Sequence, residues 1–151
     1  MKTLFIGFRG KHNTSAMLVH QLSKDPLLLT NSFAGLERDI LSIAEDYDSI
    51  YMFGVNKSLK DAVRIEQCAM FQGALTSSSY DIQALSQQMM QYRIHHSISD
   101  TPTQYLCNAA YYHMLCKNRN TVFIHIPSIK GMDDILVEQL LTLFREIQFD
   151  G

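Results

Sequence analysis

Three short segments of the chain are almost continuously apolar, and they limit the possible folds more than any other feature. They are residues 2–8, 48–54 and 121–127, and each ends at or beside a glycine or a proline. Strands that are buried on both faces of a parallel sheet have this pattern, whereas half-exposed strands alternate apolar and polar residues. We therefore expect these three segments to form the centre of a parallel sheet.

Other strand signals alternate with helical repeats around this centre. Further strands are predicted at residues 27–33, 63–70 and 93–99, of which 63–70 can run in either direction. Apolar residues recur at helical spacing in residues 14–22, 36–47 and 82–89 and in the segment after Asp133, and Asn13 suits the N-cap of the first helix. Strands that alternate with helices require crossover connections, so we predict a three-layer α/β/α sandwich with a mostly parallel, mixed sheet.

Size and charge narrow the class of protein. The chain has 151 residues, 46% hydrophobic and 19% charged, with a formal net charge of −2, which suits one globular domain over residues 1–151. No cluster of Lys and Arg forms the basic stripe that nucleic acids or anionic membranes require. We expect neither of them as a partner.

Location and redox state follow from two further patterns. No apolar run resembles a signal peptide or approaches the length of a membrane span, so a cytoplasmic protein is expected. The three cysteines, Cys68, Cys107 and Cys116, contain no CxxC pair, which indicates reduced thiols and argues against a disulfide scaffold or a zinc site. We expect no metal and no cofactor.

Several common catalytic signatures fail. The Gly7 to Lys11 segment resembles part of a phosphate loop, but its glycine spacing is wrong and His12 stands where Ser or Thr would hold magnesium. His95 and His96 are adjacent on a predicted strand, so they point to opposite faces and cannot share one metal. HExxH and GxSxG motifs are absent from the sequence.

The segment QYLCNAAYYHMLC, residues 104–116, predicts a mostly buried helix with Cys107 in its first turn. Backbone N–H groups are unpaired there and the helix dipole favours negative charge, so Cys107 is expected to be a better thiolate than an ordinary cysteine. The same N–H groups can stabilise the oxyanion of a tetrahedral intermediate. The alternative is a buried cysteine that packs as a small hydrophobic residue.

A nucleophilic thiol needs a base, and His125 is the best candidate. It lies at the end of a buried apolar strand, where polar residues are uncommon and binding sites form. His113 lies about 240° around the helix from Cys107 and is a poor partner, while Cys116 lies about 180° away and is interpreted as core, like Cys68. A hydrogen-bonded core or rim histidine is the alternative interpretation of His125.

Glu66 is the candidate that would orient the imidazole. It falls in the middle of the predicted strand 63–70, where a carboxylate is a poor strand former and costs free energy if it is buried without a partner. A carboxylate next to a catalytic histidine fixes its tautomer. A solvated edge strand would explain Glu66 equally well.

Around these three residues the sequence resembles the pyroglutamyl peptidase I family, also called pyrrolidone-carboxylate peptidases, which are cysteine peptidases of the C15 type. The segment IEQCA, residues 65–69, resembles the family's Glu-Arg-Val-Ala strand, and YLCN, residues 105–108, followed by two tyrosines resembles its nucleophile motif. FIHIP, residues 123–127, is similar to its Phe-Val-His-Val-Pro motif. Gly7-Phe8 and Gly54 resemble the family's opening motif and glycine-rich turn.

The resemblance implies a phosphorylase/hydrolase-like α/β fold and removal of an N-terminal pyroglutamyl residue from peptides. It assigns Cys107 as nucleophile, His125 as general base and then acid, and Glu66 as the residue that orients His125. It further implies that Phe8 packs on the pyroglutamyl ring and that the backbone around Tyr105 and Leu106 binds the lactam. Family members often form dimers or tetramers, so a homo-oligomer is possible.

The sequence also departs from the family pattern. The opening loop and the segment between Met70 and Tyr80 are shorter than in typical members, no arginine occurs between Arg64 and Arg93, and PTQ at residues 102–104 replaces Ala-Gly-Arg. Three alternatives therefore stay open beside the pyroglutamyl peptidase. They are an amidase for another small N-acyl substrate, a noncatalytic binding protein that keeps the family fold, and a thiol-based redox or acyl-transfer protein.

Overall fold

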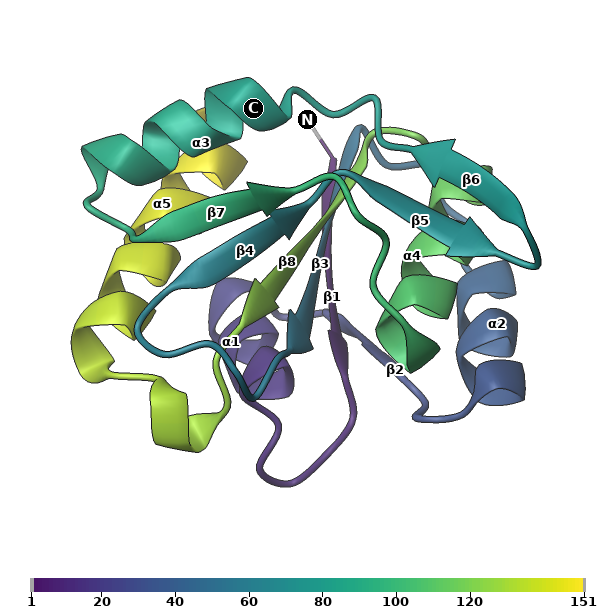
Figure 1. The fold of residues 1–151 in the computed structure, drawn as a ribbon, viewed down its shortest axis with the longest axis horizontal. Coiled ribbons are helices and arrows are strands. Elements are labelled where there is room, and N and C mark those ends of the chain that lie inside the picture. Colours follow the sequence, from purple (N-terminus) through teal and green to yellow (C-terminus); the bar gives the residue numbers. More distant parts are fainter. Residues whose placement is uncertain (1, 151) are drawn as a thin grey trace.

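Six strands form a mixed sheet with helices against both faces in the computed structural model, which describes residues 2–150 and side chains through residue 149 (Figure 1). The strand order is β2-β1-β3-β8-β4-β7. These strands are β1 (Thr3–Phe8), β2 (Leu27–Leu29), β3 (Ser49–Val55), β4 (Val63–Glu66), β7 (His96–Ser99) and β8 (Thr121–Ile126). The helices are α1 (Thr14–Leu22), α2 (Phe33–Leu41), α3 (Ile82–Gln91), α4 (Tyr105–Lys117) and α5 (Asp134–Asp150), with a 3₁₀ turn η1 (Ile129–Gly131).

Strand direction divides the sheet into two parts. Strands β2, β1, β3 and β8 are mutually parallel, whereas β4 pairs antiparallel with β8 and parallel with β7. This arrangement confirms the predicted mostly parallel, mixed sheet in an α/β/α sandwich. The three continuously apolar segments are β1, β3 and β8, and they lie next to one another as expected.

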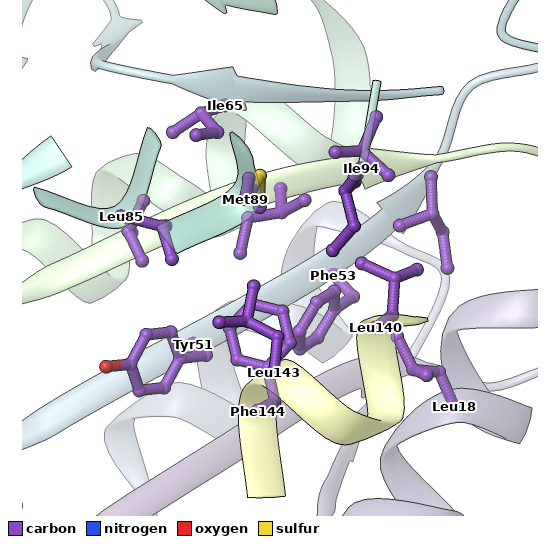
Figure 2. Close-up of a cluster of buried hydrophobic side chains, with 14 of the residues drawn as sticks. Leu18, Tyr51, Phe53, Ile65, Leu85, Met89, Ile94, Leu140, Leu143 and Phe144 are labelled. Carbon is purple, nitrogen blue, oxygen red and sulfur yellow. The ribbon is translucent and has the colours of Figure 1, made fainter. Parts of the chain in front are cut away.

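Alternation along the strands builds two separate cores. Phe53 and Ile124 point to the face that α1, α3 and α5 cover, within a large cluster of buried apolar side chains. Figure 2 shows part of this cluster, in which Tyr51, Phe53 and Phe144 lie together. Met52 and Phe123 point to the other face, against α2 and α4. Gly54 and His125 are in phase with Met52 and Phe123, so the candidate site lies on the α2/α4 face.

The predicted strand 63–70 is wrong as a single element. Strand β4 ends at Glu66, and residues from Cys68 onward leave the main sheet as β5 (Cys68–Phe71), which forms a hairpin with β6 (Ala74–Ser77). The turn between them places Gln72 and Gly73 at positive φ, 50° and 81°, as tight hairpin turns require. The hairpin packs on α4, beside the candidate site (Figure 1).

Two other predicted strands are shorter than expected because turn chemistry interrupts them. In the segment 27–33, only Leu27–Leu29 forms a strand, since the Ser32 side chain accepts a hydrogen bond from Gly35 N at 3.0 Å and starts α2. In the segment 93–99, Arg93 adopts a φ of 60° after α3, and the strand begins at His96.

Helix boundaries follow the predictions more closely. Asn13 caps α1 as predicted, its Oδ1 accepting from Ser15 N at 2.9 Å and from Ala16 N at 3.4 Å. Helix α2 ends at Leu41, so the predicted repeat to residue 47 overruns it. Within the described residues, no helix is long and apolar enough to cross a membrane.

Candidate active site

Strand register brings together the residues that the sequence had singled out. Gly54 on β3 is paired with His125 on β8, and Arg64 on β4 is paired with His125 from the other side. Glu66 lies two residues beyond Arg64 and therefore points to the same face. Helix α4 covers this face and carries Cys107 in its first turn.

Glu66 is a buried carboxylate, not a residue of a solvated edge strand. Strand β4 lies between β8 and β7, and the residue is only 2% exposed. Its two oxygens accept hydrogen bonds from Nε of Arg64 at 3.1 and 3.2 Å. The hydroxyl of Tyr111 on α4 donates to the Glu66 backbone carbonyl at 2.8 Å, which ties the end of β4 to the helix.

His125 is buried next to this carboxylate without a hydrogen bond to it. Its Nδ1 lies 3.7 Å from Oε1 of Glu66, and the residue is 4% exposed. Nδ1 is the one buried side-chain nitrogen or oxygen in the described part of the chain that has no hydrogen-bond partner. A buried polar atom left in this state is uncommon. The ring also contacts Phe123, with the centroids 4.8 Å apart.

Cys107 lies directly over Gly54, which places its sulfur beside the strand position paired with His125. A Cβ atom built on Gly54 would lie 2.9 Å from Sγ of Cys107 and 2.6 Å from Cζ of Phe123. Any side chain at position 54 would therefore collide with both residues. The close approach of the thiol to the sheet explains why glycine occupies this position.

The expectation of an activated Cys107 thiolate is wrong for this structure. Burial, together with the negative charge of Glu66, raises the pKa of the Cys107 thiol to about 12. The prediction considered the unpaired N–H groups of the first turn and the helix dipole, which is worth typically 0.3–1 kcal/mol, and left burial out. Desolvation of a thiolate outweighs that contribution, so Cys107 is a neutral thiol near neutral pH.

Residues implied to bind substrate surround the start of α4 and the end of β1. Tyr105 is 79% exposed and adopts a φ of 65°, an unusual conformation for a residue with a side chain. Leu106 packs at the margin of the α2/α4 core. Phe8 is buried, and its ring centroid lies 6.4 Å from that of Phe123. All three belong to the same side of the molecule as Cys107.

Cys116 and His113 lie outside this cluster, whereas Cys68 lies near Glu66. Cys68 is buried, as predicted. Cys116 is exposed, so its interpretation as core is wrong. Cys107 faces the sheet, and Cys116 lies about 180° around the helix axis from it, on the side that faces solvent. His113 lies 3.4 Å from Glu37 and packs against Phe71, in agreement with its exclusion as the partner of Cys107.

Two residues of this region were missed at the sequence level. Arg64 is one, and its spacing of two residues from Glu66 on a strand is the signal that could have found it. Asn108 is the other: its Oδ1 accepts from Met70 N at 3.0 Å and its Nδ2 donates to Met70 O. Asn108 thereby fixes the hairpin β5–β6 to α4 directly after Cys107.

Solved structures with the same fold are pyrrolidone carboxyl peptidases. The enzyme from the hyperthermophile Pyrococcus furiosus superposes with a TM-score of 0.80 at 19% identity, covering 99% of both chains. The enzyme from Thermococcus litoralis gives 0.77 at 15% identity, over 99% of this chain and 94% of that one. The enzyme from Thermus thermophilus gives 0.76 at 16% identity, over 95% and 98%.

Sequence comparisons add nothing to this structural likeness. No protein-family model matches the chain, and no curated protein matches it. At identities below 20% the structural neighbours show that the chain has the fold of pyrrolidone carboxyl peptidases. Function has to be argued from the site itself.

Proposed function

We propose that this protein is a cysteine peptidase that removes an N-terminal pyroglutamyl residue from peptides. The carrying observation is the convergence of Glu66, His125 and Cys107 on one face of a sheet, with the thiol seated over Gly54. Buried polar groups of three catalytic types have no packing reason to gather there. The fold shared with pyrrolidone carboxyl peptidases supports this substrate class over other acyl amides.

His125 acts as the general base in this proposal. Its Nδ1 faces Glu66, so Nε2 is the ring nitrogen left to take the proton from Sγ of Cys107. The sulfur then attacks the acyl carbon of the pyroglutamyl residue, and unpaired N–H groups at the start of α4 stabilise the oxyanion. Protonated His125 gives its proton to the leaving amine, and a water molecule activated by His125 hydrolyses the thioester.

The neutral state of Cys107 determines the order of these steps. With a pKa of about 12, the thiol holds its proton until His125 removes it. Proton transfer therefore accompanies attack on the substrate, in contrast to enzymes that rest as a thiolate and imidazolium pair. Glu66 contributes by stabilising the imidazolium once it has formed.

A fluorogenic pyroglutamyl amide tests the proposal directly. The wild-type protein is expected to release the fluorophore, Cys107→Ser to release none, and Cys116→Ser to match the wild type because Cys116 is exposed and outside the site. Prolyl and acetyl amides of the same fluorophore test the amidase alternative. Release from those amides but not from the pyroglutamyl amide would overturn the proposed substrate.

A noncatalytic protein with the same fold is the second candidate, and one observation favours it. The Cys107 thiol is buried and its pKa is raised, as in a cysteine that serves only packing. If no acyl amide is turned over while Cys107→Ser folds with unchanged stability, the noncatalytic reading replaces the peptidase.

We further propose the cytoplasm as the location, because the thiols stay reduced there.

A further inference from the structure

Arg64 shares the carboxylate that the proposed mechanism needs for His125. Its Nε hydrogen-bonds both oxygens of Glu66, at 3.1 and 3.2 Å, while Nδ1 of His125 remains 3.7 Å from Oε1. Arg64 is also the direct cross-strand neighbour of His125 on the antiparallel pair β4 and β8. Side chains in such positions lie close together on the same face.

The arginine has two electrostatic effects on its neighbours. Glu66 is a buried carboxylate, and the guanidinium supplies the opposite charge that a buried charged group needs. The same positive charge lies beside the imidazole and disfavours a second cation there.

Other titratable groups around the pair do not supply this charge. Three titratable groups face the Glu66–His125 pair: the Cys107 thiol and the Tyr111 phenol from α4, and the Cys68 thiol from β5. Burial raises the pKa of all three, so they are neutral near neutral pH. Among the described residues, Arg64 and His125 are the two cationic or potentially cationic side chains in contact with Glu66.

We propose that Arg64 is a positioning residue that holds the Glu66 carboxylate off His125 until His125 takes the proton of Cys107. The inference rests on the proposed cysteine peptidase. When the proton moves from Sγ to Nε2, the imidazole becomes a cation and Glu66 closes on its Nδ1–H. A closure of roughly 0.5–1 Å brings the 3.7 Å separation into hydrogen-bond range. When the proton passes to the leaving amine, Glu66 returns to Arg64.

Titration of the His125 ring by NMR tests this without requiring turnover. In Arg64→Met, which keeps an apolar stem and removes the charge, the midpoint of the His125 titration is expected to rise by at least about one pH unit. In Arg64→Lys, which keeps the charge, the midpoint is expected to stay near the wild-type value. Arg64→Gln serves as a second neutral variant if Arg64→Met does not fold.

Activity provides the second measurement. The acidic limb of the pH profile for kcat/KM is expected to move upward in Arg64→Met by the same amount as the NMR midpoint, with KM unchanged. A lower rate at every pH with an unmoved limb would indicate a purely structural arginine and would overturn the inference. An unmoved NMR midpoint in both neutral variants, or an equal rise in Arg64→Lys, would overturn it as well. If no variant or wild type turns over a pyroglutamyl amide, the proposed function fails while the NMR midpoint still decides the role of Arg64.

Discussion

The two faces of the sheet differ in how completely their buried polar groups are hydrogen-bonded. The face under α1, α3 and α5 is packed with aromatic rings: Phe144 contacts Phe5, Tyr51 and Phe53 with ring centroids 5.1–6.3 Å apart. The Tyr51 hydroxyl there is hydrogen-bonded to that of Tyr80, and Figure 2 shows Tyr51, Phe53 and Phe144. The face under α2 and α4 has an apolar core of its own, but that core is interrupted by the buried carboxylate of Glu66, its half-buried partner Arg64 and a thiol.

This difference shows how the same sheet serves stability and chemistry. Close packing of aromatic rings makes one face a rigid support. The other face leaves Nδ1 of His125 unpartnered and buries the Cys107 thiol near a carboxylate, which costs stability that the first face supplies. Substitutions on the two faces should therefore separate activity from stability.

Removal of the nucleophile should have the largest effect. Cys107→Ala is expected to lower turnover of a pyroglutamyl amide by about 10⁴-fold or more, because no other described thiol lies over Gly54. Its free energy of unfolding should change by only about 1 kcal/mol, since one sulfur is lost. Steady-state kinetics and denaturant unfolding of the same preparation provide both values. Residual activity above a tenth of wild type would contradict the assignment.

Truncation on the opposite face should reverse this pattern. Phe144→Ala is expected to lower the free energy of unfolding by about 3–5 kcal/mol, because the ring is fully buried among three aromatic neighbours. At temperatures where the variant is still folded, kcat per folded molecule should match the wild type. A loss of kcat without a loss of stability would show that the two faces are not separable in this way.

A substitution at Gly54 should lower both activity and stability. Gly54→Ala places a methyl group 2.6 Å from Phe123 and 2.9 Å from the Cys107 sulfur, so it should destabilise the protein by about 1–3 kcal/mol and displace the thiol. A drop in kcat of about 10²-fold is expected from that displacement. Wild-type activity in Gly54→Ala would place Cys107 away from the sheet.

Alkaline pH should produce the smallest change, and its sign follows from the buried acids. Burial raises the pKa of Cys107 from its ordinary value of 9.0 to about 12, and it raises the pKa of Tyr51 and Tyr111 as well. The folded state therefore holds protons that the unfolded state releases above about pH 9, so stability is complete below that pH and falls as pH rises. Denaturant unfolding should show a loss of about 1 kcal/mol between pH 8 and 10, and a smaller one in Cys107→Ala. A flat profile would mean that the thiol is solvated.

Much of this fold was predictable because the signals are local. The apolar runs of β1, β3 and β8 and the cap at Asn13 depend on neighbours in the sequence, and the structure confirms them. The break after Glu66 was not predictable, because the end of β4 depends on its pairing with β7 and β8, which lie far along the chain. Strand β5 instead pairs with the adjacent strand β6.

The candidate site also has a part that the sequence predicts and a part that it does not. Position at a helix start and at a strand end indicated Cys107 and His125, and a carboxylate in the middle of a predicted strand indicated Glu66. The structure places the three on one face of the sheet. The neutral state of the Cys107 thiol and the exposure of Cys116 depend on which side of α4 meets the sheet, which helical spacing alone does not fix. The pairing of Arg64 with Glu66 depends on β4 being an internal strand, which buries Glu66 beside a half-buried Arg64.

The most direct test of the central claim is detection of the acyl-enzyme. The protein is mixed with a pyroglutamyl amide, quenched in acid during turnover, digested and analysed by mass spectrometry. The account predicts a gain of one pyroglutamyl group on the peptide that contains Cys107 and none on the peptide that contains Cys116. Turnover without any acyl group on Cys107, or acylation of Cys116 at an equal level, would contradict it.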